Sequence, residues 1–180
     1  MAVLNLNTLV ATIQSPRIAD GHGAGMIGTS SFGAPKTYRR TDNGIIITQY
    51  LMDITGLQSP TTDGDVIGLA AGAAYFGQNV VADNGIIFKT EFACFETPTT
   101  GINNIDVAVL ASGELAMDGE GGTDLMANAG VLIIGQSVVN LIPTIPADYY
   151  FYLIAGAGGT ADTYASGQYM FTTWGHALLA

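Results

Sequence analysis

Asp42-Asn43-Gly44-Ile45-Ile46-Ile47 is the stretch that decides the fold, and Asp83-Asn84-Gly85-Ile86-Ile87-Phe88 repeats its pattern. Asn-Gly accepts positive φ at both central residues of a two-residue turn, so it is the strongest local signal for a β-hairpin. The β-branched and aromatic side chains that follow each turn suit a half-buried pleated sheet. Each stretch therefore predicts a hairpin turn that leads into a strand.

The residues after each turn alternate in character, as expected of strands with one face in a core. After the first turn the even positions predicted to face inward are Ile46, Thr48, Tyr50, Met52 and Ile54, with Gln49 and Asp53 opposite. After the second turn the predicted inward positions are Ile86, Phe88, Phe92 and Cys94, and Lys89 and Glu91 share the other face. We therefore expect Phe88 and Phe92 to lie in the core.

The sequence pattern predicts seven or eight short strands, separated by turn signals, and no helix of useful length. This pattern indicates an all-β fold. A two-sheet antiparallel sandwich fits this spacing. A jelly roll is favoured among sandwiches because the strands are irregular in length and joined by long loops, and a barrel is the alternative. The repeated turn does not indicate a duplication, because its odd offset maps the inward Tyr50 onto the polar Glu91.

Charge divides the chain into two parts. Residues 1–40 carry a net charge of +3, and residues 41–180 carry −13 with Lys89 as their one base. This asymmetry predicts an extended, basic N-terminal arm over 1–40 and an acidic β-sandwich body over 41–180. The arm holds five glycines between Gly21 and Gly33, so it is not expected to fold alone. Two interpretations stay open: an arm that orders on a partner, and a flexible tail or long surface loop.

Composition points to an assembly. Only 11% of the residues are charged, against about 25% in ordinary domains. With 24 glycines and a mean hydropathy of +0.36, such a chain is expected to hide surface against neighbours. The acidic body argues against nucleic-acid binding, which needs a basic footprint. No apolar run approaches the ~20 residues of a membrane helix, and the first residues lack the basic start of a secretory signal, so we expect a soluble protein made in a cytoplasm.

Candidate chemistry is sparse, and we expect neither an enzyme nor a cofactor. His22 and His176 have no sequence-adjacent partner of the kind a catalytic histidine needs. Cys94 is the one cysteine, expected to be a buried structural thiol. A carboxylate pair for glycoside hydrolysis could be drawn only from Glu91, Glu96 and Glu114. A loop with Asp118, Glu120 and Asp124 resembles the start of a calcium loop, but Gly122 and Ala129 occupy ligand positions, so a solvated acidic loop is favoured.

Tyr149-Tyr150-Phe151-Tyr152-Leu153-Ile154 has no polar face, whereas an ordinary antiparallel strand exposes one side to water. Either both faces are buried in the sandwich or one face meets another subunit. We predict a homo-oligomeric contact through Tyr150 and Tyr152, or else through Phe151, because tyrosine suits an interface. Alternatively, Tyr149, Tyr150 and Tyr152 would form the aromatic platform of a carbohydrate- or receptor-binding module.

Several stretches of the body resemble a family of small virion structural proteins of tailed phages. They run in order over residues 50–57, 62–69, 90–98, 105–107, 148–156 and 167–176, and none is a catalytic motif. The resemblance implies a jelly-roll capsid decoration or cement protein on the outer surface of the virion. Its partner would be the major capsid protein, and it would self-associate, with a homotrimer favoured and a dimer possible.

On this reading the N-terminal arm contacts the shell, and its candidate capsid-binding residues are Arg17, Lys36, Tyr38, Arg39 and Arg40. Repetition over many identical shell sites would strengthen weak contacts. The alternative from another class is a carbohydrate- or receptor-binding jelly-roll module of a tail fibre. A high copy number on the shell favours the first function, and a low copy number at the tail favours the second.

Overall fold

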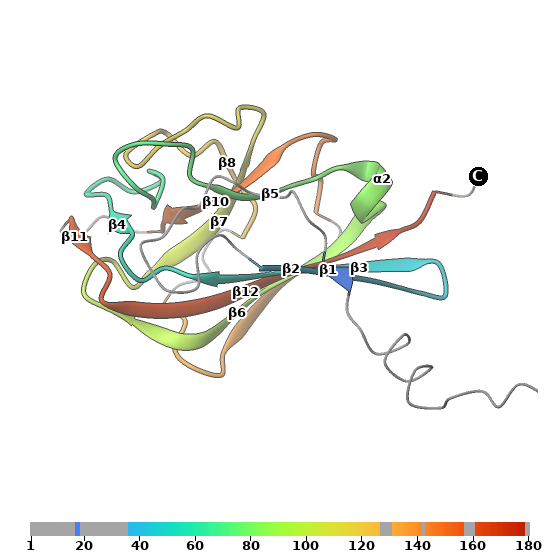
Figure 1. Cartoon of the computed structure of the whole chain (residues 1–180), viewed down its shortest axis with the longest axis horizontal. Coiled ribbons are helices and arrows are strands. Elements are labelled where there is room, and N and C mark those ends of the chain that lie inside the picture. Colours follow the sequence, from blue (N-terminus) through green and yellow to red (C-terminus); the bar gives the residue numbers. More distant parts are fainter. Residues whose placement is uncertain (1–16, 19–35, 127–130, 142, 157–160, 179–180) are drawn as a thin grey trace, which may run out of the picture.

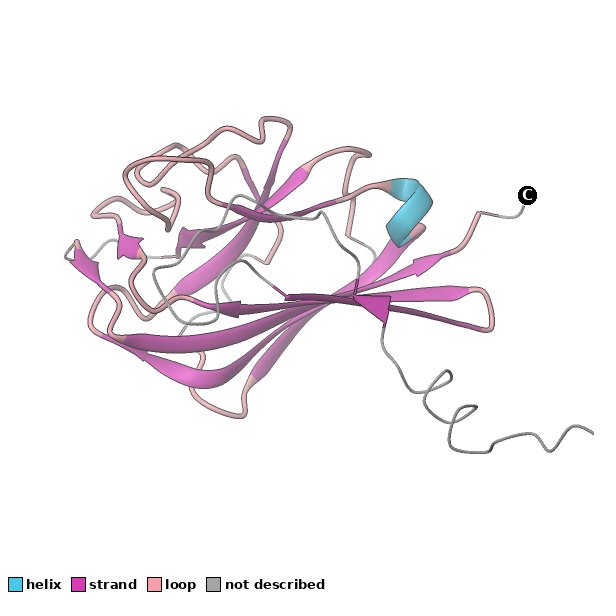
Figure 2. Ribbon diagram, in the orientation of Figure 1, coloured by secondary structure: helices cyan, strands magenta, loops and turns pink. Residues whose placement is uncertain are grey.

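The computed structural model describes residues 17–18, 36–126, 131–141, 143–156 and 161–178, and within them the chain is almost entirely β (Figures 1 and 2). One six-stranded sheet has the order β1 (Arg17–Ile18), β2 (Lys36–Asp42), β3 (Ile45–Asp53), β12 (Ser166–His176), β6 (Ile86–Thr99) and β9 (Ser137–Leu141). The second sheet has the order β5 (Tyr75–Gln78), β10 (Tyr150–Ala155), β7 (Ile105–Leu110) and β8 (Thr123–Asp124). A short ribbon pairs β4 (Gln58–Ser59) with β11 (Asp162–Thr163).

The two larger sheets have jelly-roll connectivity, so the predicted all-β sandwich is confirmed. From β3 to β12 the chain passes repeatedly between the two sheets, with β7 and β8 in succession in the four-stranded sheet, and this places β3, β12, β6 and β9 side by side in one layer. The same pattern places β5, β10, β7 and β8 side by side in the other. All of the pairings are antiparallel. This is the arrangement of two interleaved Greek keys.

The first Asn-Gly signal forms the predicted hairpin. Asp42 pairs with Ile45 across a two-residue turn in which Asn43 and Gly44 have φ of 47° and 78°. Positive φ at both positions matches the twist of the flanking strands. In β3 the burial alternates strictly, with the predicted residues facing inward, so the parity assigned to this strand is confirmed.

The second Asn-Gly signal does not form a hairpin, and that prediction is wrong. Val81–Asn84 is a single helical turn, α2, which ends at Gly85 with φ of 68°. Asn84 is fully buried: its Oδ1 accepts from the Thr48 hydroxyl at 2.9 Å and its Nδ2 donates to the Gln78 carbonyl at 2.9 Å. A Cβ on Gly85 would collide with the His176 carbonyl. Close packing against Thr48, Gln78 and His176 therefore outweighed the hairpin preference of this Asn-Gly dipeptide.

The predicted parity of β6 holds for only part of the strand. Lys89 pairs with Trp174 while Ile87 pairs with the next residue, Gly175, so Phe88 is an extra residue in a β-bulge. Upstream of the bulge the inward residue is Ile87, whereas Ile86 is 59% exposed and Phe88 is half-buried. Predictions for those two residues were wrong because a bulge reverses the faces. Downstream, Phe92 and Cys94 are fully buried as predicted.

The core between the sheets is built around aromatic rings. Tyr50, Phe76, Phe151 and Phe171 are fully buried and pack with ring centroids 5.2–6.3 Å apart. Phe92 stacks on Tyr169 at 5.0 Å. In Figure 1, α2 lies at one end of this sandwich, and β4 and β11 lie at the opposite end.

A second apolar cluster covers the outer face of the four-stranded sheet. It consists of the buried Val66, Ala74, Ala108, Tyr152 and Ile154. The segment around Val66 pairs with β10 at Ile154, and the Ala74 amide donates to the Leu115 carbonyl at 2.7 Å. Loops therefore bury the second face of β10, which explains why this strand carries no polar side.

The boundary between arm and body lies earlier than predicted. Residues 36–40 belong to β2, which pairs with β3 along its whole length, and β1 pairs with β2. These residues are thus part of the six-stranded sheet. The remaining arm positions, 1–16 and 19–35, lie outside the described residues.

Candidate interaction surface

Charge is distributed unequally over the two sheets. All five Lys and Arg residues lie in β1, β2 or β6 of the six-stranded sheet. The four-stranded sheet and the loops around it contain no Lys or Arg and carry the acids Asp63, Asp65, Asp106, Glu114, Asp118, Glu120, Asp124 and Asp148. The molecule therefore has one strongly acidic layer and one layer in which basic and acidic residues are mixed.

The outer face of the six-stranded sheet is formed by the side chains that alternate with the core residues. Register places Arg40, Ile47, Trp174, Lys89 and Leu141 in one row across five strands. The Lys89 ammonium lies 3.8 Å from the centre of the Trp174 ring and 3.8 Å from a Glu91 carboxylate oxygen. Ile47 and Trp174 are only partly buried. This face offers apolar surface with nearly balanced charge, which suits contact with another protein.

The predicted capsid-binding residues do not all lie on the same face of the sheet. Arg39 faces inward, where its guanidinium lies 3.2 Å from an Asp83 carboxylate oxygen and its Nε donates to the Thr48 hydroxyl at 3.4 Å. This side chain ties β2 to α2 on the face opposite to Arg40, and its role in shell binding stays a prediction. Arg40 is exposed and Tyr38 half-buried on the outer face. Arg17 and Lys36 are placed by their backbones alone, and their side chains lie outside the description.

Two of the three residues predicted for an oligomer contact in β10 are wrong, and the role of Tyr150 stays a prediction. Phe151 and Tyr152 are both 0% exposed within a single chain, so neither can meet a second copy. The Tyr152 hydroxyl donates to the Ser112 carbonyl at 2.7 Å, and burial raises the pKa of Tyr152 to about 12. Tyr150 is half-buried against Tyr75, with ring centroids 4.9 Å apart. Burial also takes Tyr152 out of the predicted aromatic platform, whereas Tyr149 and Tyr150 are half-buried.

A cluster of exposed apolar side chains that sequence reasoning missed lies near β9. Six of the eight large apolar residues exposed in the described part of the chain are Phe95, Val131, Ile133, Ile134, Val139 and Leu141. The turn before β9 packs on β6, with the Ile134 amide donating to the Thr97 hydroxyl at 2.9 Å and the Gly135 amide to the Cys94 carbonyl at 2.9 Å. A signal for this cluster was available, because no charged residue occurs between Asp124 and Asp148.

The sequence candidates for catalysis are not brought together. His176 is exposed and stacks on Phe88 at 4.6 Å, and His22 lies outside the described residues. Cys94 is a buried free thiol, as predicted, and burial raises its pKa. Glu91 is paired with Lys89, while Glu114 is exposed in the loop that follows β7. Within the described ranges, no group of His, Cys, Asp and Glu could hold a metal ion, including the loop with Asp118, Glu120 and Asp124.

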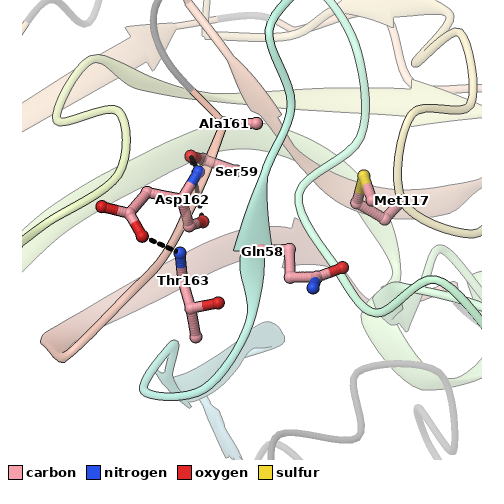
Figure 3. A pocket seen from close by; sticks show the side chains of 6 residues that line it. All are labelled: Gln58, Ser59, Met117, Ala161, Asp162 and Thr163. Carbon is pink, nitrogen blue, oxygen red and sulfur yellow. Dashed lines mark hydrogen bonds between the residues drawn. The ribbon is translucent and has the colours of Figure 1, made fainter.

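An open hollow of about 320 Å³ lies beside the β4–β11 ribbon (Figure 3). Its lining residues are Gln58, Ser59, Met117, Ala161, Asp162 and Thr163. The Asp162 carboxylate accepts from the Thr163 amide at 2.7 Å, and the Ser59 hydroxyl donates to the Asp162 carbonyl at 3.3 Å. These hydrogen bonds hold β4 and β11 together beside the hollow.

No helix in the described part of the chain is long and apolar enough to cross a membrane. No family model matches the chain, and neither a curated protein sequence nor a solved structure matches it.

Proposed function

We propose that this chain is a capsid decoration or cement protein of a tailed phage, bound to the major capsid protein on the outer surface of the virion after synthesis in the host cytoplasm. The proposal combines the resemblance of the body to such proteins with the separation of charge between the two sheets. The separation of charge is the main support for the proposal, because it gives the molecule one face suited to contact with a protein and one face suited to water.

Attachment is assigned to the outer face of the six-stranded sheet. Partly buried apolar side chains, Ile47 and Trp174 among them, lie there between the exposed Arg40 and the Lys89–Glu91 pair. On the opposite side the acidic layer would face solvent, where like charge keeps decorated particles apart. Many identical shell sites would raise the occupancy of an individually weak contact through effective concentration.

Co-sedimentation with purified particles that lack this protein tests the proposal. Arg40→Glu should weaken binding, and the loss should be greater at low salt than at high salt because exposed charge pairs are screened. Glu114→Arg is the matched control, because it also reverses one exposed charge but lies in the acidic layer. Equal loss of binding in both variants, or no binding of the wild-type protein to shells, would refute the assigned attachment face.

Copy number separates this function from the alternative, a receptor-binding module of a tail fibre. A decoration protein should be present in many copies distributed over the shell, and gold-labelled antibody should mark the whole capsid surface. Label confined to the tail would support the fibre module instead. The burial of Tyr152 already removes one feature of that alternative.

A further inference from the structure

Strand β9 is an edge strand of unusual character. It pairs with β6 over Ser137–Leu141 and, among the residues that the structure describes, has no strand on its other side. An edge strand presents a row of backbone N–H and C=O groups that can pair with another chain. Here that row is five residues long, which is an ordinary strand length.

The devices that normally protect such an edge are missing from β9 itself. Charged residues or proline on the edge prevent pairing with other chains, and residues 131–141 contain neither. Val139 is 47% exposed and Leu141 is 67% exposed, on the same parity of the strand. The surface left open is therefore both apolar and able to form hydrogen bonds along its backbone.

Charge favours a second copy of this chain as the occupant. Two chains that each carry a net charge of −10 can approach closely only where acids are absent. Strand β9 and the turn before it have no charge, and the charges opposite them on β6, Lys89 and Glu91, neutralise each other at 3.8 Å. On the neighbouring sheet, Asp124 in β8 precedes Leu125, whose carbonyl accepts from the Asn140 amide at 2.8 Å.

The strand also matches itself in antiparallel register. With Val139 opposite Val139 of the second copy, Ser137 lies opposite Leu141, and all five residues pair. Residues directly opposite each other in an antiparallel pair point to the same face. The register therefore places Val139 and Leu141 of both copies together on the outer face. Val138 and Asn140 share the inner face.

We propose that β9 is a self-association edge, at which two copies of this chain pair their β9 strands antiparallel about a twofold axis through Val139 and join two six-stranded sheets. Such an isologous contact closes at two copies, so the assembly is a dimer rather than the trimer expected from the sequence. The contact runs along the β9 edge, whereas Arg40, Ile47 and Trp174 of the shell-attachment face lie on β2, β3 and β12, so either proposal can fail without the other.

Cysteine cross-linking tests the register. Cys94 is fully buried, so a cysteine introduced at the surface is the reactive one. Val139→Cys should give a covalent dimer on oxidation or with a short bismaleimide. Ser137→Cys, on the same strand and face, should not, because the two copies of position 137 would be roughly 13 Å apart at ~3.3 Å per residue. The double variant Ser137→Cys with Leu141→Cys should restore the cross-link.

Sedimentation equilibrium tests the assembly itself. The wild-type protein should have twice the chain mass of 18.6 kDa, and Val139→Lys should have the single-chain mass. Leu178→Lys is the control, because Leu178 is an exposed apolar residue outside β9, at 60% against 47% for Val139. A monomeric wild-type protein, an unchanged mass for Val139→Lys, or equal cross-linking at positions 137 and 139 would overturn the proposal. If Val139→Lys does not fold, the cross-linking comparison still decides.

Discussion

The bulge in β6 makes a quantitative prediction that separates two neighbouring phenylalanines. Phe92 is 0% exposed and stacks on Tyr169 with ring centroids 5.0 Å apart and an interplanar angle of 11°. Removing such a ring costs about 3–5 kcal/mol of unfolding free energy. Phe88 sits on the bulge, is half-buried, and contacts the exposed His176 ring, so Phe88→Ala should cost about 1 kcal/mol.

Thermal unfolding followed by circular dichroism measures the difference. A domain of this size loses about 2–4 °C of Tm per kcal/mol, so Phe92→Ala should lower Tm by about 6–20 °C and Phe88→Ala by about 2–4 °C. Urea denaturation of the same variants gives the free energies directly.

Ile87→Ala and Ile86→Ala form a matched pair for the same bulge. Ile87 is 8% exposed, so Ile87→Ala should lower the free energy of unfolding by about 2–5 kcal/mol. Ile86 is 59% exposed, so Ile86→Ala should lower it by well under about 1 kcal/mol. If Phe88→Ala destabilises as much as Phe92→Ala, or Ile86→Ala more than Ile87→Ala, the strand has no bulge at Phe88 and the reasoning fails.

Two further variants probe buried polar and acidic groups. Asn84→Ala leaves the Thr48 hydroxyl and the Gln78 carbonyl without their amide partner and should cost about 2–4 kcal/mol in urea denaturation, while Asn103→Ala at an exposed position should change little. Partial burial raises the pKa of Asp124. The Met126 amide, which donates to the carboxylate, lowers this pKa, and the nearby Asp63 raises it further. Its ionised form is disfavoured in the folded state, so Asp124→Asn should stabilise at pH 7, by less than about 1 kcal/mol at this exposed site. The gain should disappear below pH 3.8, where the carboxyl is protonated in both states, and a gain that persists there would contradict this assignment.

The sequence correctly predicted those elements that depend only on residues adjacent in the chain. The Asn43-Gly44 turn needs only two residues that accept positive φ, and the alternation in β3 follows from the twofold periodicity of a strand with one face in a core. The all-β class, the buried Cys94 and the shared outward face of Lys89 and Glu91 followed in the same way.

The same local signal failed at Asn84-Gly85 because tertiary contacts compete with turn preference. There the Asn84 amide bonds to Thr48 and Gln78, and the backbone packs directly against Gly175 and His176. The parity of β6 failed for a related reason, since a bulge depends on how β12 pairs with it.

For the candidate interaction surface, the sequence showed which residues are uncharged and apolar, but it did not show that they are exposed. The uncharged run between Asp124 and Asp148 is visible in the sequence, yet nothing local shows whether such a run is core or surface. Strand order places β9 at the edge of its sheet. The core between the sheets buries Phe151, and loops over the four-stranded sheet bury Tyr152, although both residues looked better suited to an interface. Sequence by itself determined which segments could bury apolar surface, because hydrophobicity and turn preference are properties of neighbouring residues. Only the tertiary structure decided which of them remained exposed, because exposure depends on what distant parts of the chain cover.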